Sequence, residues 1–434
     1  MAATANAGGP TLRLMRFLVA LLLFFCLLPA TGETAPQIQL RDLKEAAALG
    51  NELYANSRAT GLVLVVVRGK EVFFRGYGET APGSHSAPTE DSVVRLCSLT
   101  KTFTTDMLAR LAASGVVRLN EPLANLAPPG MTAPELGAPI TLENLATHTA
   151  GLEREIGTAP RRTPHFTYPD FETRWNWLQH TQLLYTPGTQ ALYSNVGFDL
   201  LSDALADATK TPYPTLLEQR TLEPLRMWQT TFYPSAEQCA RLLRGSLNEG
   251  PCTATDNTMG SSGLYSTPED MAHWLRHLLD EGAPAQTAQT TGAEAVYLLP
   301  SSLKRQYGLS HAGQPSGIGL AWMHLGATGD LSHLIEKTGG GAGFITYIAI
   351  HPASHTALFV GITEGRYGWR PGFNLFKASN NGLLALAGLP PLPETSRSRA
   401  AARRTTHTAR LVRVKKRHRA TQPAHGTQQG SAGQ

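Results

Sequence analysis

Three short motifs, far apart in the chain, constrain this sequence most. They are Ser98-Leu99-Thr100-Lys101, Tyr193-Ser194-Asn195 and Lys337-Thr338-Gly339. The first offers a hydroxyl nucleophile with a lysine one helical turn away. The second offers a phenol and an amide, and the third a cation and a hydroxyl beside glycines. One such motif means little, but all three in this order predict a fold that gathers them into one nucleophilic site.

The surroundings of Ser98 distinguish it from a second Ser-x-x-Lys match. Apolar residues follow Ser98 near helical spacing, which predicts that it lies at a helix N-terminus where backbone N–H groups favour developing negative charge. Ser301-Ser302-Leu303-Lys304 follows Pro300 and comes after the Tyr-Ser-Asn motif, so we interpret it as a surface turn. An ordinary N-cap serine with a solvated Lys101 is the alternative for Ser98, and the other two motifs weigh against it.

Residues 1–32 have the pattern of an export signal. Arg13 and Arg16 precede an apolar run from Phe17 to Leu28, and small residues follow. The run is short for a membrane span. We therefore predict a cleaved signal peptide, with an uncleaved inner-membrane anchor as the alternative.

The last segment, residues 391–434, is predicted to be a disordered basic tail. From residue 396 on it holds ten Lys and Arg residues and no acid. Setting these ten and the two leader arginines aside leaves 26 basic against 33 acidic residues, a net charge of −7 for the body. The tail is either a solvated extension or an electrostatic contact to anionic membrane or wall polymer. Nucleic acid is not expected as a partner of an exported chain.

The cysteines fit export. Cys239 and Cys252 are close in sequence and flank a polar loop, so in an oxidising compartment we expect them to form a disulfide, with two free thiols as the alternative. Cys97, next to Ser98, is interpreted as a small buried packing residue.

Two sets of strands enclose a long helical middle. After a helix at 41–56, the run GLVLVVV (61–67) predicts a strand covered on both faces, and 71–78 its hairpin partner. The later elements are strands at 317–325, 333–338, 344–351 and 356–363 and a helix at 372–387. We predict an α/β (α+β) fold: an antiparallel sheet flanked by helices, built from residues 33–115 and 300–390 of a domain spanning 33–390, with a mostly helical subdomain, 116–299, inserted.

With these residues in place, the chain resembles the serine DD-peptidase and class C β-lactamase superfamily over roughly residues 41–389. Tyr-Ser-Asn as the second motif indicates the class C-like branch. Four longer stretches resemble its periplasmic D-alanyl-D-alanine carboxypeptidases/endopeptidases: NLATHTAGL (144–152), TPGTQALYSNVGFDLLSDALA (186–206), GSSGLYSTPEDM (260–271) and EKTGGGAGFITYIAI (336–350). The basic tail is the departure from this pattern.

The resemblance implies a β-lactamase/transpeptidase-like fold and a role for each residue of the site. Ser98 would be acylated, and Lys101 and Tyr193 would share its activation, with the proton acceptor left open. Asn195 would hold Lys101 and the substrate amide, and Lys337 and Thr338 would bind a terminal carboxylate. Gly339 would let the substrate backbone approach closely. The N–H groups of Ser98 and Gly340 would form the oxyanion hole. No cofactor and no metal are implied.

Several functions use the same residues. The leading hypothesis is a D-alanyl-D-alanine carboxypeptidase/endopeptidase acting on peptidoglycan stem peptides in the periplasm, with β-lactams as covalent ligands. A class C β-lactamase and an esterase are the alternatives. A non-catalytic penicillin sensor or wall-binding protein is disfavoured, because a pure binder needs no paired Lys101 and Tyr193.

Three further histidines are interpreted as structural. His148, followed by Thr149, is predicted in a turn beside the cleft. His273 and His277 have a spacing that can bind zinc, but no third ligand is evident, so we predict a surface helix.

Overall fold

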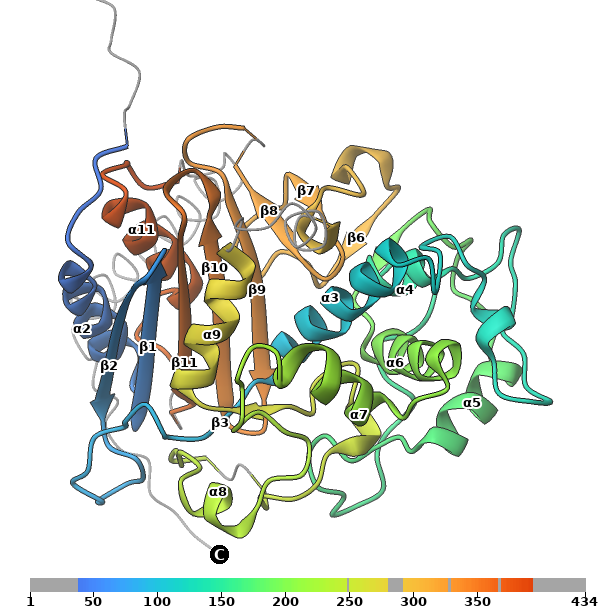
Figure 1. Cartoon of the computed structure of the whole chain (residues 1–434), viewed down its shortest axis with the longest axis horizontal. Helices are drawn as coiled ribbons and strands as arrows, with labels where there is room; N and C mark the ends of the chain where they lie inside the picture. The colour runs from blue at the N-terminus through green and yellow to red at the C-terminus, as the bar shows by residue number, and fades with distance from the viewer. Residues whose placement is uncertain (1–37, 248–249, 280–291, 327–328, 366–367, 393–434) are drawn as a thin grey trace, which may run out of the picture. The chain divides into compact units, whose positions relative to one another are not determined.

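The computed structural model of the chain (Figure 1) describes residues 38–392 apart from 248–249, 280–291, 327–328 and 366–367. The predicted signal peptide and the basic tail from residue 393 on lie outside the described residues. Within the described ranges, none of the helices combines the length and hydrophobicity of a membrane-spanning segment.

Seven strands of the described residues form one sheet in the order β2-β1-β11-β10-β9-β8-β7 (Figure 1). Neighbouring strands are all antiparallel, and the N-terminal pair joins the C-terminal strands where β1 pairs with β11. The predicted meeting of the two strand sets is confirmed. The bounds are β1 Gly61–Arg68, β2 Glu71–Gly78, β7 Gly317–Ile318, β8 Met323–Leu325, β9 Leu334–Gly341, β10 Phe344–His351 and β11 Thr356–Thr363.

Both faces of the sheet are covered by helices. Helices α2 (Ala46–Ser57) and α11 (Leu375–Leu386) pack on one face, and α9 (Pro268–Leu279) packs on the other. Side chains of β1 alternate between the two apolar cores: Val63 and Val65 enter the core on the α9 side, Leu64 and Val66 the core on the α2 side. This alternation explains why β1 is a continuous apolar run.

Helix α9 corrects one prediction. It lies within 116–299, the segment assigned to the helical insertion, yet it packs on β1 and β11. Its apolar residues recur at helical spacing, so one wide face needs a partner, which the sheet supplies. Trp274 on this face stacks on Phe103 at 3.9 Å between ring centroids. His277 is only 9% exposed and its Nε2 lies 3.0 Å from Asp106 Oδ1, so the prediction of a surface helix was wrong.

The stretch 317–325 is a second correction. One strand was predicted, but the chain forms the two short strands β7 and β8, paired antiparallel. The turn between them is tight: Gly319 N–H donates to Trp322 O at 2.8 Å, and Ala321 has a φ of +67°. An apolar run alone does not reveal such a reversal.

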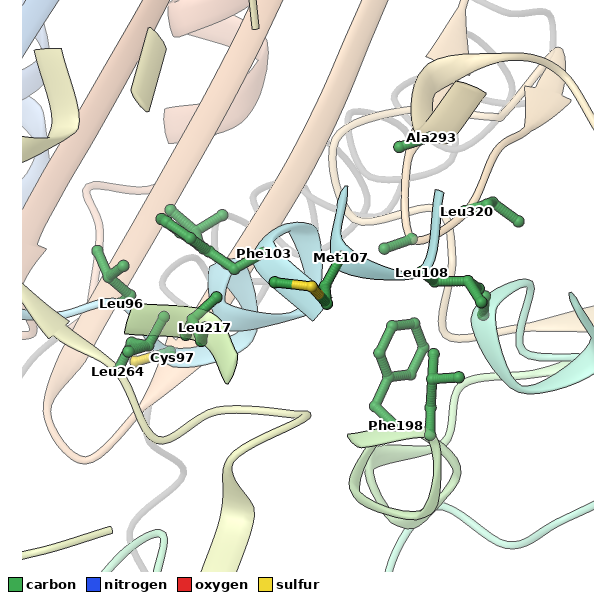
Figure 2. Packing of buried hydrophobic residues seen from close by; sticks show 14 of the residues in the cluster. Leu96, Cys97, Phe103, Met107, Leu108, Phe198, Leu217, Leu264, Ala293 and Leu320 are labelled. Atoms are coloured by element: carbon green, nitrogen blue, oxygen red, sulfur yellow. The ribbon is translucent and has the colours of Figure 1, made fainter. Parts of the chain in front are cut away.

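Helix α3 (Thr100–Ala113), the helix that follows Ser98, packs against α6. Figure 2 shows Phe103, Met107 and Leu108 of α3 among buried apolar side chains, with Phe198 of α6 among them. The other elements of this region are α4 Leu142–Ala146, α5 Phe171–His180, α6 Asn195–Thr209, α7 Tyr213–Leu217, α8 Ala236–Ala240, and the strand pairs β3 Val94–Arg95 with β5 Tyr265–Ser266 and β4 Ala191–Leu192 with β6 Gln306–Tyr307.

Cys239 and Cys252 form the predicted disulfide, with Cα atoms 5.7 Å apart. Replacing both cysteines by serine should lower the free energy of unfolding by about 3 kcal/mol, because the unfolded chain gains the freedom of an open loop. Chemical denaturation of the parent and of the double variant measures the difference. The matched control is Cys97→Ser, which removes a buried thiol but no cross-link. A parent whose stability is unaffected by reduction of the bridge would contradict this expectation.

Candidate active site

The predicted nucleophile lies in a 3-10 turn, Cys97–Leu99, that leads directly into α3. This turn packs against β9 and β10, so the helix start is held against the sheet. Lys101, in the first turn of α3, places Nζ 3.4 Å from Ser98 Oγ. The distance is that of a hydroxyl and an amine that can exchange a proton after a small approach.

Lys101 is fully buried and held from two further sides. Its Nζ donates to Asn195 Oδ1 at 2.7 Å and to the backbone oxygen of Ser261 at 2.8 Å. Burial lowers the pKa of Lys101 to about 7, so the amine and ammonium forms differ little in free energy near neutral pH. Either form of the side chain is therefore accessible to the chemistry.

Tyr193 and Asn195 enter the site where β4 leads into α6. Ser194 caps α6, its Oγ accepting from Gly197 N–H at 3.0 Å, and this fixes the residues on either side of it. Lys101 Nζ and Lys337 Nζ each lie 5.0 Å from the centroid of the Tyr193 ring. The second motif thus lies between the cations of the first and third.

Strand β9 supplies the third motif. Lys337 is buried, and burial together with the nearby Lys101 ammonium lowers its pKa. A Cβ on Gly339 would lie 2.2 Å from Thr346 Oγ1 and 2.8 Å from Leu96 O, so only glycine lets β9 approach the segment before Ser98. Thr346 Oγ1 closes this contact by donating to Leu96 O at 2.7 Å.

All three motifs border one cavity of about 210 Å³. Its lining residues are Ser98, Arg154, Tyr193, His311, Thr338, Gly339, Gly340, Ile345, Trp369 and Phe376. The structure therefore brings the predicted residues together: Lys101 and Asn195 contact each other behind Ser98, and Lys337 faces Tyr193. Ser301 lies in an exposed 3-10 turn, Pro300–Ser302, away from this cavity, as interpreted from its sequence.

A larger cavity, about 720 Å³, lies elsewhere, bordered by α6, α7 and the segment that follows α7. Its lining includes Trp228, Tyr233 and Asp256 but no residue of the three motifs. The smaller cavity is the candidate site, because the Ser98 hydroxyl, with the Lys101 amine behind it, and the Thr338 hydroxyl converge there. In the part of the chain that the structure describes, no group of three or more His, Cys, Asp or Glu side chains forms a metal site.

His148 is closer to the chemistry than its predicted turn suggested. The residue is buried, and its ring stacks on Tyr193 with centroids 4.4 Å apart. Its Nδ1 accepts from Ser194 N–H at 3.1 Å, and burial, with Lys337 and Lys101 nearby, lowers its pKa well below the usual range. A neutral His148 ring that packs against Tyr193 has a structural role, as we predicted from the sequence.

Sequence reasoning missed the charged residues around the motifs. Arg154 has its guanidinium carbon 4.9 Å from the Tyr193 centroid, and Glu155 accepts a hydrogen bond from Asn195 Nδ2. Asp199 and Ser261 lie behind Lys101. One signal was available for Asp199: it interrupts the apolar run of α6 four residues after Asn195, on the same helix face.

Fold and site together define a serine hydrolase of the penicillin-recognising class. The sequence profile of the β-lactamase family matches residues 45–368, and the chain belongs to that family. It is 40% identical over 315 residues to the D-alanyl-D-alanine-carboxypeptidase/endopeptidase AmpH of Escherichia coli K12, covering 72% of this chain and 82% of the relative.

Solved structures agree in fold. A β-lactamase/D-alanine carboxypeptidase from Yersinia pestis, crystallised with citrate, is 37% identical and superposes with a TM-score of 0.74 over 80% of this chain and 99% of its own. A class C β-lactamase from Rhodobacter sphaeroides, 21% identical, has a TM-score of 0.61 over 79% of this chain and 99% of its own, a likeness of fold alone. The predicted family and fold class are confirmed.

Proposed function

We propose that this protein is a serine D-alanyl-D-alanine carboxypeptidase/endopeptidase that acts on peptidoglycan stem peptides in the periplasm. The observation that carries the proposal is Lys101 Nζ, within reach of both Ser98 Oγ and Asn195 Oδ1 beside a cavity also bordered by Thr338. A relative with this activity in its name shares 40% of its residues over most of both chains.

The proposed reaction is acyl transfer through Ser98. Its Oγ attacks the carbonyl of the penultimate D-Ala while its proton passes to the Lys101–Tyr193 pair. The C–N bond then breaks, the terminal amine leaves with a proton from the same pair, and water releases the acyl group. Lys337 and Thr338 bind the terminal carboxylate, because a cation and a hydroxyl match its charge and its lone pairs.

The oxyanion that forms in each half-reaction needs donors in place. The backbone N–H groups of Ser98 and Gly340 belong to residues that border the same cavity. Their proposed role is to hold the carbonyl oxygen as it gains charge, which is worth about 3–4 kcal/mol for one donor in such enzymes.

A class C β-lactamase with the same residues is the second candidate, favoured by the shared fold. The rival activities differ in how fast water releases a penicilloyl group. Incubation with pentapeptide muropeptides and with a chromogenic cephalosporin, at equal enzyme concentration, separates them. We expect D-Ala release at many turnovers and a single slow turnover of the cephalosporin; rapid cephalosporin turnover without D-Ala release would overturn the proposal.

The basic tail is proposed to hold the enzyme near an anionic surface and to take no part in the reaction. Deleting residues 396–434 removes ten basic residues and leaves the body, whose net charge is −7, so turnover of a small D-Ala-D-Ala peptide should be nearly unchanged. The same deletion should reduce co-sedimentation with anionic vesicles at low salt, since each Lys or Arg near such a surface contributes about 1 kcal/mol. Neutral vesicles are the control. Lost peptide turnover would make the tail part of the catalytic fold, and unchanged sedimentation would leave it a solvated extension.

A further inference from the structure

A buried carboxylate lies directly behind Lys101. Asp199, on α6 one turn after Asn195, is 2% exposed. Its Oδ1 accepts from Ser261 N–H at 2.9 Å, and its Oδ2 accepts from Ser261 Oγ at 3.0 Å. Ser261 in turn accepts from Lys101 Nζ through its backbone oxygen at 2.8 Å. Asp199 therefore accepts from both the backbone N–H and the hydroxyl of Ser261, the residue whose backbone oxygen binds Lys101.

We propose that Asp199 is a positioning residue for the acyl transfer: through Ser261 it fixes Lys101 Nζ beside Ser98. Asp199 touches no reacting atom in this arrangement. The inference rests on the role of Lys101 in activating Ser98 and not on which substrate the enzyme uses.

The burial of Lys101 favours a charged group at this position over a neutral hydrogen-bond acceptor. An uncompensated ammonium is costly to bury, and Lys101 has only neutral oxygens as direct acceptors. The Asp199 carboxylate opposes the lowering of the Lys101 pKa that burial causes. Burial also raises the pKa of Asp199 itself, so the protonation states of Asp199 and Lys101 depend on each other.

A neighbouring ion pair leaves Asp199 available for this role. Arg174 on α5 forms two hydrogen bonds to Asp203, at 2.9 and 3.0 Å, and Trp175 Nε1 donates to the same carboxylate. Asp203 is thus the direct partner of Arg174, while Asp199 feels that cation at longer range. The charged and titratable groups around Lys101 or Asp199 include Arg174, Asp203, Glu155, Arg154, Lys337, His148, Tyr193, Tyr213 and Cys97.

The test is the pH dependence of Ser98 acylation in Asp199→Asn. Asparagine has the shape of aspartate and can still accept from Ser261 N–H, but it carries no charge. Without the carboxylate, Lys101 should lose its proton at lower pH, by about one unit. If the amine form of Lys101 is required, the acidic limb of the profile moves to lower pH; if the ammonium is required, the basic limb moves to lower pH.

The readout is the rate of labelling by a fluorescent penicillin between pH 4.5 and 10, approximately the range in which Lys and buried acids titrate. This rate does not require peptide turnover, so failure of the D-Ala-D-Ala assignment and failure of the Asp199 role are told apart. A profile for Asp199→Asn that superposes on that of the parent overturns the proposal.

Two variants control for packing. Asp199→Glu keeps the charge and should keep the limb at the parental pH even if its maximal rate falls. Asp203→Asn removes a buried carboxylate one turn further along the same helix that acts on Asp199 but not on Lys101, so it should cost stability and move the limb much less than Asp199→Asn does. An equal shift in Asp203→Asn would overturn the specific role of Asp199. If the Asn variant does not fold, Asp199→Ser removes the same charge and is judged by the same shift.

Discussion

Replacing Ser98 by alanine should abolish covalent labelling by penicillin and lower kcat/KM for a D-Ala-D-Ala peptide by about 10³-fold or more, as loss of a serine nucleophile does elsewhere. The physical reason is that Ser98 Oγ, at the start of α3, lies 3.4 Å from Lys101 Nζ, within reach of an amine that can take its proton. Labelling is measured on a denaturing gel and kcat/KM by D-Ala release.

The chain contains its own control for this experiment. Ser301→Ala changes the other Ser-x-x-Lys serine, which lies in an exposed turn. It should label and turn over like the parent. Circular dichroism of Ser98→Ala should match the parent, since only one oxygen is removed. Labelling that persists in Ser98→Ala but disappears in Ser301→Ala would reverse the assignment.

Gly339→Ala is expected to have the second largest effect, a loss of about 10²-fold in kcat/KM, because displacements near 1 Å in an active site cost that much. The new Cβ would overlap Thr346 Oγ1 and Leu96 O, so β9 must move away from the segment before Ser98. Acylation rates by penicillin and D-Ala release should fall together.

Gly340→Ala is the matched comparison. A Cβ there has its nearest neighbour, Phe344 O, at 3.9 Å, and the backbone N–H is retained. Its loss of activity should be far smaller than that of Gly339→Ala. Equal losses in the two variants would mean that the contact between β9 and the Leu96–Ser98 segment does not set the geometry of the site.

Much of the sheet could be predicted because its strands carry their own signals. The run at 61–67 has no polar residue, which requires cover on both faces, and α2 and α9 supply it. Strands β10 and β11 have the predicted bounds, since each is a β-branched and aromatic run between turn residues.

The misplaced elements are those whose position depends on distant partners. The sequence of α9 shows an apolar face but not what it packs on, and the choice of β1 and β11 is a tertiary one. The reversal at 319–322 depends on the backbone of Gly319 and Ala321, which a hydrophobic pattern does not encode.

For the candidate site, the order of the motifs in the sequence identified the motif residues but not the charged residues around them, such as Asp199. Ser98, Lys101, Tyr193 and Lys337 stand out because their residue types carry chemistry at fixed spacings. Asp199 does not, because it acts through the backbone of Ser261, 62 residues away in the chain. Only the fold shows that an acid in α6 lies behind the lysine of α3.

The most direct test of the account is to trap the acyl-enzyme. The parent enzyme is mixed with a D-Ala-D-Ala peptide, quenched in acid during turnover, digested and analysed by mass spectrometry. We expect the acyl group, less one D-Ala, to be attached to Ser98 and free D-Ala to appear in step with turnover. D-Ala release with no modified Ser98, or an acyl group on another residue such as Ser301, would contradict it.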